Sequence, residues 1–301
     1  MYIAITFLVL CFSKNTAAQQ IEQFSQYALS NFITNPAAAV EKDNPHLNFF
    51  YRRQWLGAFN GDEPTTFLLA AQMRLEQFEN VGVGAKLYTD KTGPTRRTGI
   101  ELSYAYKMKL GDSKSKLALG ISAMALQYNI DFTRLIASDP SDPALLASID
   151  NKITGDMDAG AFLYGKNYYA GITVNQIFNS NFVFGDDTTG VLQLARHYFI
   201  NAGYKYKLSD SFDLEPSILI KAVEAAPVQY DINALLVYEN AYWIGANYRT
   251  QDAVGIIAGL KFNDVWKLGY AYDITISNLN QVSTGSHEIM LGYKFSRKEV
   301  Y

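Results

Sequence analysis

Residues 265–276 alternate between large apolar or aromatic side chains and small, polar or charged ones. The large side chains occupy the even positions Trp266, Leu268, Tyr270, Tyr272, Ile274 and Ile276. After a polar loop, a second such row contains His287, Ile289, Leu291, Tyr293 and Phe295. A period of two predicts β-strands. Aromatic residues near the strand ends and charges of both signs on the opposite face are typical of a transmembrane barrel with a polar lumen.

Composition limits the alternatives. The chain has 301 residues, of which 49% are hydrophobic and 14% aromatic, yet no stretch reaches the roughly 18 apolar residues of a membrane helix. A membrane protein of this kind must therefore be a closed barrel, because only helices and barrels satisfy their backbone in lipid. A soluble sandwich also alternates, but its inner face is commonly Val, Leu and Ile. The sequence thus predicts an all-β, antiparallel, up-and-down transmembrane β-barrel.

The pattern gives about fourteen strands. Their expected spans are 46–54, 64–75, 81–89, 98–110, 116–130, 156–165, 167–176, 192–208, 211–223, 227–239, 241–250, 253–262, 265–276 and 286–296. Parity changes near Ala123, which suggests a β-bulge there.

Every second connection is short, as in bacterial barrels with short periplasmic turns and longer outer loops. This alternation predicts an even strand number with both termini in the periplasm. Connections near Ala225 and Gln251 are also short, so one sector of the outer rim should be low. Residues 90–97, 131–155 and 177–191 are expected to be outer loops.

The chain divides into three expected parts. Residues 1–18 resemble a signal peptide with small residues before the cleavage point, residues 19–45 form an N-terminal segment, and residues 46–301 form the outer-membrane barrel. Cys11 alternatively permits a lipoprotein, although Leu10 is large for the position before a lipidated cysteine. Cleavage near Ala18 leaves no cysteine, which excludes disulfides and thiol catalysis.

No catalytic or cofactor site is expected. The three histidines, His46, His197 and His287, do not have metal-ligand spacing. Ser286 and His287 point to opposite faces of one strand and cannot form a dyad. The net charge of −3 gives no indication of a nucleic-acid partner.

The lumen carries the informative chemistry. The charged side chains at strand positions expected to face the lumen are Arg52, Arg74, Lys86, Glu101, Lys107, Asp213, Glu215, Lys221, Arg249, Lys261, Lys267, Asp273, Glu288 and Lys294. A water-filled pore tolerates such charges because they stay solvated. A plugged barrel instead requires them to be paired or hydrogen-bonded.

The N-terminal segment is the candidate plug. It is rich in aromatic and amide side chains and has no strand period, so it would be left exposed unless it packs somewhere. We expect residues 21–40 to enter the periplasmic half of the lumen, with Phe24 and Tyr27 leaving water and with Gln23, Ser25, Gln26 and Asn35 bonding to a charged wall. That wall consists of Arg52, Lys221, Arg249, Asp273 and Glu288. The alternative is a mobile leader outside an open pore.

An ordered set of short motifs resembles one family, the PorP/SprF membrane proteins of the type IX secretion system. The set comprises Phe24-Ser-Gln-Tyr27, Asn35-Pro-Ala-Ala38, Arg52-Arg-Gln-Trp55, Pro64-Thr-Thr66, Pro216-Ser-Ile-Leu-Ile-Lys221, Tyr248-Arg249, Gly269-Tyr-Ala-Tyr-Asp273 and Gly285-Ser-His-Glu-Ile289. It covers the mature chain in family order. Val40 departs from the glycine that usually follows the Asn-Pro-Ala run, so the turn there is expected to differ.

The resemblance implies a non-enzymatic barrel in the outer membrane of a Gram-negative, gliding or type IX-secreting bacterium. Family members are usually encoded beside a large secreted adhesin or surface protein with a C-terminal sorting domain, which they help to secrete or anchor. The implied partners are that surface protein, other type IX components and outer-membrane lipid. The long loops 131–155 and 177–191 are the candidate docking surface, and a passive porin is the alternative function.

Overall fold

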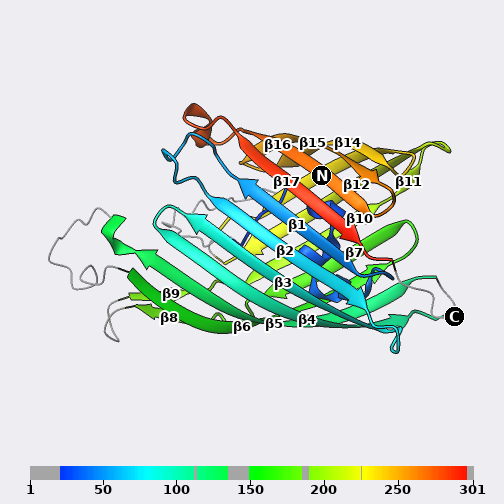
Figure 1. Ribbon diagram of the computed structural model, residues 1–301, viewed down its shortest axis with the longest axis horizontal. Coiled ribbons are helices and arrows are strands. Elements are labelled where there is room, and N and C mark those ends of the chain that lie inside the picture. The colour runs from blue at the N-terminus through cyan, green and yellow to red at the C-terminus, as the bar shows by residue number, and fades with distance from the viewer. Residues whose placement is uncertain (1–20, 112–113, 135–148, 185–189, 225, 297–301) are drawn as a thin grey trace, which may run out of the picture.

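The computed structural model describes residues 21–296 except 112–113, 135–148, 185–189 and 225. The expected signal peptide lies outside these ranges. Figure 1 shows one closed, tilted barrel with the N-terminal segment, coloured blue, inside it. In this part of the chain, no helix is long and apolar enough to cross a membrane.

Fourteen antiparallel strands form the barrel, as predicted. They are β1 (His46–Arg53), β2 (Thr65–Arg74), β3 (Val81–Thr92), β4 (Thr95–Lys109), β5 (Lys116–Asp131), β6 (Ile149–Tyr164), β7 (Tyr168–Asn175), β10 (His197–Tyr204), β12 (Phe212–Val223), β13 (Gln229–Tyr238), β14 (Tyr242–Arg249), β15 (Ala253–Phe262), β16 (Trp266–Thr275) and β17 (Ser286–Lys294). Pairing of β1 with β17 closes the sheet, with His46 opposite Lys294 and Arg52 opposite Glu288. The short β11 (Tyr206–Lys207) continues β10 along β12.

The outward side chains form an apolar band. On β4 they are Ile100, Leu102, Tyr104, Tyr106 and Met108, all of them exposed. Similar rows follow β15 and β16. Exposure of so much apolar surface in a regular belt fits lipid as the surrounding medium.

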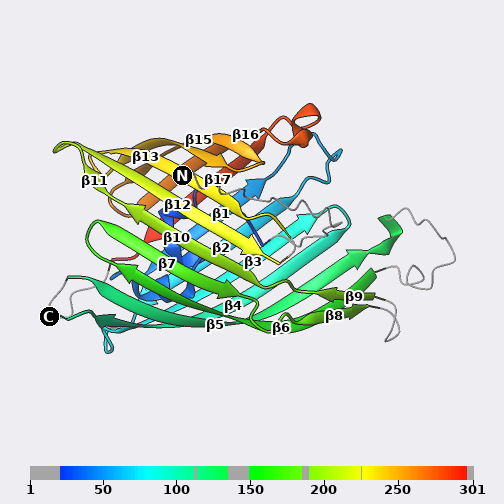
Figure 2. The same cartoon turned by 180° about the vertical axis from the view of Figure 1, so that it is seen from behind.

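The barrel is taller on one side. Strands β3 to β6 extend well past the outer ends of β12 to β17 (Figures 1 and 2). The predicted loop 90–97 is wrong: β3 and β4 continue to Thr92 and Thr95 around a tight turn at Gly93. The predicted strand 192–208 is divided, because its first residues belong to β9 (Gly190–Gln193), which pairs with β8 (Asn181–Phe184) in a separate hairpin.

The predicted bulge near Ala123 is also wrong. The β4–β5 register continues without interruption from Thr95↔Ile130 to Lys109↔Lys116. The alternation of large and small residues changes phase in the sequence because Leu126 points inward, where it packs against Phe182 of the β8–β9 hairpin, while Ala123 and Ala125 face outward. A second layer on the inner face, which periodicity does not reveal, accounts for the error.

The N-terminal segment folds into three short 3₁₀ helices: η1 (Tyr27–Leu29), η2 (Asn31–Ile33) and η3 (Pro36–Val40). Asn35 precedes η3, and its side chain accepts a hydrogen bond from the Ala37 N–H, while Pro36 starts the turn. The segment and the inner wall share the main apolar cluster, which includes Phe24, Phe32, Phe50 and Phe162.

Candidate functional site

Arg52 is the centre of a charged wall inside the barrel. Its guanidinium donates to Asp273 Oδ2 at 2.7 Å and to Glu288 Oε2 at 3.0 Å. The three side chains are almost completely buried. The sheet register places them together, because Arg52 lies opposite Glu288 and Asp273 lies one strand further, on β16. Since all three are removed from water, each depends on the others for compensation.

A second arginine extends this wall. Arg249 Nε lies 2.7 Å from Asp231 Oδ1, and its Nη1 lies 3.1 Å from Asp252 Oδ2. Lys221 Nζ is 2.6 Å from the other Asp231 oxygen. We call Arg52, Lys221, Asp231, Arg249, Asp252, Asp273 and Glu288 the charged wall.

Ser25 of the N-terminal segment inserts between the two arginines. Its hydroxyl donates to Asp273 Oδ2 at 2.6 Å and accepts from Arg52 at 2.9 Å and from Arg249 at 3.3 Å. Its backbone N–H donates to Glu288 Oε2 at 2.7 Å. Because both the hydroxyl and the backbone of one small residue are bound, the position of the segment is fixed closely.

Gln26 and Tyr27 continue the contact. The Gln26 N–H donates to Glu288 Oε1 at 3.0 Å, and the amide approaches Gly269, where an added Cβ would lie 2.1 Å from the Gln26 Oε1. The Tyr27 hydroxyl donates to the Asp231 carbonyl at 2.9 Å. Burial raises the pKa of Tyr27, so it remains a neutral donor.

Phe24 packs on the wall instead of bonding to it. Its ring centroid lies 5.1 Å from that of Phe50 on β1, and both rings are buried. Of the predicted site residues, therefore, Phe24, Gln26, Tyr27, Arg52, Lys221, Arg249, Asp273 and Glu288 come together in one region of the lumen.

Asn35 does not join them. Its amide donates to the carbonyls of Ala161 and Ile172 on β6 and β7, at 3.0 and 3.3 Å. The expectation that Asn35 bonds to the charged wall is wrong. The physical reason is that Asn35 caps η3, which holds it on the opposite side of the lumen.

That opposite side is a glycine wall. At six glycines that face the lumen, an added Cβ would lie less than 3.0 Å from an atom of the N-terminal segment: Gly82, Gly84, Gly120, Gly160, Gly171 and, on β16, Gly269. At Gly120 the obstacle is the backbone nitrogen of Ala37, at 2.4 Å. We use "glycine wall" for the five glycines on β3, β5, β6 and β7. They give the segment room that any larger residue would occupy.

Two members of the charged wall and two amides beside it were not predicted. Asp231 and Asp252 were missed, as were Asn233, which donates to the Ser25 carbonyl at 3.0 Å, and Asn247, which donates to Asp273 at 3.2 Å. Strict parity on β13 would have revealed Asp231 and Asn233, because Tyr230 and Ile232 face outward.

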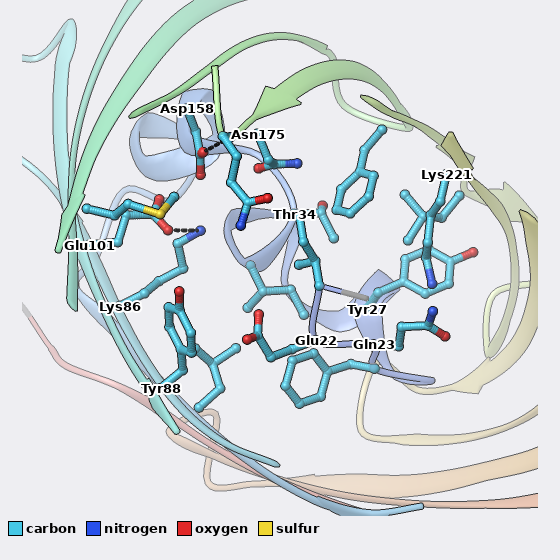
Figure 3. Close-up of a pocket in the computed structure, with 18 of the residues that line it drawn as sticks. Glu22, Gln23, Tyr27, Thr34, Lys86, Tyr88, Glu101, Asp158, Asn175 and Lys221 are labelled. Carbon is cyan, nitrogen blue, oxygen red and sulfur yellow. Dashed lines mark hydrogen bonds and ion pairs between the residues drawn. The ribbon is translucent and has the colours of Figure 1, made fainter. Parts of the chain in front are cut away.

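A second polar group surrounds the start of the segment (Figure 3). Lys86 pairs with Glu101 at 2.7 Å, and Arg97 lies 3.1 Å from Asp90 and 3.7 Å from Glu22. Burial raises the pKa of the Glu22 carboxyl, although the nearby Arg97 opposes that shift.

The segment crosses most of the lumen. Arg52, beside Ser25, lies next to one end of β1, whereas the segment joins β1 at His46, six residues away. At about 3.3 Å per residue this is roughly 20 Å. The segment therefore reaches further into the lumen than predicted, since we expected it to fill only the periplasmic half.

Several spaces remain beside the segment. The cavity beside Tyr27 and Lys86 in Figure 3 is about 60 Å³. Larger spaces lie toward the outer rim, at about 350 Å³ around Trp55 and Lys221 and about 280 Å³ around Trp55 and Arg97. A space of about 190 Å³ lies around Lys166 at a turn of the opposite end. In the ranges that the structure covers, no group of three or more His, Cys, Asp or Glu residues is placed to hold a metal ion.

Comparison with models of protein families identifies the family of this chain. Residues 16–293 match the model of "Type IX secretion system membrane protein PorP/SprF". The chain belongs to this family. With the closed barrel and its apolar outer band, the match makes it an outer-membrane protein.

Solved structures share the fold. The chain is similar to the CymD monoaromatic hydrocarbon channel, with 15% identity, 92% of this chain and 94% of that chain covered, and a TM-score of 0.53. It is also similar to the TodX deltaS2S3 mutant monoaromatic hydrocarbon channel, with 11% identity, 88% and 94% covered, and a TM-score of 0.51. No curated protein sequence matched the chain.

Proposed function

We propose that this protein is a non-enzymatic scaffold of the type IX secretion system that helps to secrete or anchor a partner surface protein carrying a C-terminal sorting domain. Membership of the family supports a role in the type IX secretion system. The N-terminal segment bound inside the lumen favours a scaffold over a pore. A barrel whose interior is occupied by its own chain acts through its rims.

The arrangement of the lumen supports this proposal. A diffusion porin keeps a continuous water-filled channel. Here the segment 21–40 lies across the lumen between two walls. The cavity beside Tyr27 and Lys86 is about 60 Å³, which is room for only a few water molecules, and the larger spaces of about 350 and 280 Å³ lie toward the outer rim. Removing the segment would leave Arg52, Asp273 and Glu288 without part of their hydrogen bonds, at a cost of about 1–3 kcal/mol for each neutral group lost and more for charges.

The tall sector is the proposed docking surface. Strands β3 to β6 raise it above the rest of the rim, and the β8–β9 hairpin packs against its inner face through Phe182, Leu126 and Leu194. Residues 135–148 and 185–189 of the predicted docking loops lie outside the described residues. The described strands beneath them nonetheless form a rigid platform, since their ladders are continuous.

Deletion of the gene tests the proposal. The partner surface protein should disappear from the cell surface, and the wild-type gene should restore it. Retention of a normal surface population in the deletion strain would contradict the scaffold function.

A small-solute channel is the second candidate, since the two similar solved structures are named as channels. Cavities of about 350 and 280 Å³ toward the outer rim would serve as its entrance. Liposome swelling with purified protein separates the candidates: solute flux would favour the channel, and its absence the scaffold.

A further inference from the structure

β6 extends beyond its neighbour on one side. Its ladder with β5 runs from Lys116↔Tyr164 to Asp131↔Ile149, but its ladder with β7 covers only Ala159 to Tyr164. The outer half of β6, residues 149–158, therefore has a strand partner on the β5 side alone among the described residues.

Two carboxylates direct the chain after β7 onto the inner face beside this edge. Asp158 Oδ1 accepts the N–H of Gln176 at 2.8 Å, and Asp156 accepts the N–H groups of Phe178 and Ser180 at 2.9 and 3.0 Å. Phe182 then packs on Leu126 and Tyr128 of the inner face. The residues after β7 are thus bound by side chains and inner-face packing, and β8 pairs with β9 instead of β6.

The hydrogen bonds at Met157 and Gly155 show which way the backbone groups of the outer half of β6 point. The Met157 carbonyl accepts from the Ile177 N–H, and the Gly155 carbonyl accepts from the Ser180 hydroxyl, so both face away from β5. Because backbone direction repeats every second residue, Ile153 and Asn151 present their N–H and C=O groups on the same side. In the described part of the chain neither residue has a strand partner there.

This edge stands above the lipid band. The outward row of β5 changes from Leu119 and Ile121 to Gln127 and Asn129, and its neighbours Arg96, Thr98 and Asn151 are also polar. These five polar residues surround a depression of about 240 Å³. Among them Ile153 is apolar and 74% exposed. A lone exposed isoleucine on a free strand is placed for a cross-strand apolar contact.

The outer face of the tall sector also has a positive charge. Arg96 lies directly opposite Lys91 across β3 and β4, with both on the outward row. Two like charges side by side repel one another; Lys91 Nζ lies 3.9 Å from Asp62 Oδ1, so it is beside Arg96 that a further carboxylate would be favourable. The chemistry of the face therefore favours an acidic partner surface.

We propose that the outer edge of β6, at Asn151 and Ile153, receives an extended strand from the partner surface protein. Free N–H and C=O groups repeating along an edge are matched by another extended backbone, which is the basis of recognition by strand addition. The added strand places a β-branched or apolar residue opposite Ile153, and the domain that carries it covers the polar face with carboxylates near Arg96. This inference rests on the proposed function and specifies how the partner binds.

The test uses the barrel in lipid nanodiscs and, as probe, the purified C-terminal sorting domain of a type IX-secreted surface protein from the same bacterium. Ile153→Pro removes the N–H on the open side and leaves the bonds to β5, which residues 152 and 154 make, in place. We expect affinity for the probe to fall about tenfold or more. Ile153→Ala, which keeps the N–H, should lose less. Heat-modifiable migration on gels checks that each variant is folded.

Hydrogen exchange gives a second readout with the unaltered chain. The amides of Asn151 and Ile153 should exchange rapidly in the free barrel and slowly once the probe is bound. Equal probe affinity of wild type and Ile153→Pro, or slow exchange of these amides in the free barrel, would overturn strand addition while leaving the scaffold function intact. Failure of the wild-type barrel to bind the probe would overturn both.

Discussion

The two walls of the lumen hold the same segment by different physical means. The charged wall on β1 and β12 to β17 binds residues 25–27 through ion-pair-assisted hydrogen bonds. The glycine wall on β3 to β7 binds residues 32–40 by close approach, with Phe32, Ala37 and Val40 completely buried. One wall specifies position, because charged hydrogen bonds are directional. The other supplies burial, because side chains that leave water gain free energy in proportion to area.

This difference predicts how each wall fails. A buried ion pair adds little net stability, but removing one partner leaves the other charge uncompensated. A glycine contact is disrupted differently, since a methyl group added where backbone atoms are in close contact forces the backbone to shift.

The largest effect is expected at Arg52. Arg52→Ala leaves Asp273 and Glu288 buried without their common partner, so the free energy of unfolding should fall by about 3–5 kcal/mol. Urea titration in detergent micelles measures this, and chymotrypsin cleavage at Phe24 or Tyr27 reports release of the segment.

The neighbouring Arg53 is the matched control. It pairs at the rim with Glu63, and its side chain is 38% exposed, so Arg53→Ala should cost under about 1 kcal/mol. Equal losses for the two variants would show that the charged wall has no special role.

A smaller effect is expected on the glycine wall. In Gly120→Ala the new Cβ would meet the Ala37 backbone nitrogen at 2.4 Å, so the segment must shift, at about 1–3 kcal/mol. Gly155→Ala is the control, because its Cβ would meet only the Met124 carbonyl at 3.4 Å. If chymotrypsin sensitivity of the segment rises no more in Gly120→Ala than in Gly155→Ala, the close approach is not important for stability.

The smallest effect concerns pH. Because burial raises the pKa of Glu22, its protonated form favours the folded state, so the contribution of Glu22 is most favourable at low pH and is lost as pH rises through the raised pKa. Glu22→Gln should therefore gain in melting temperature relative to wild type between about pH 4 and pH 7. Glu79→Gln, in an exposed turn, is the control for the removal of one carboxylate. A difference for Glu22→Gln that is constant with pH would contradict the shift.

The sequence predicted the barrel well because a period of two places each side chain on one face, and register then brings Arg52, Asp273 and Glu288 together. It failed where a second layer covered a strand, as at Leu126 under Phe182. It also failed at Asn35, since amide composition alone does not distinguish a helix cap from a contact with charges. The glycine wall was visible only as small residues, because a sequence does not show what they approach.

The most direct measurement of the central claim is single-channel conductance in planar bilayers. We compare wild type with a variant lacking residues 21–40, whose barrel is first shown to be folded by heat-modifiable migration on gels. The account predicts no steady conductance for wild type and a stable open pore for the deletion variant. Wild-type conductance equal to that of the deletion variant would contradict the claim that the N-terminal segment closes the lumen.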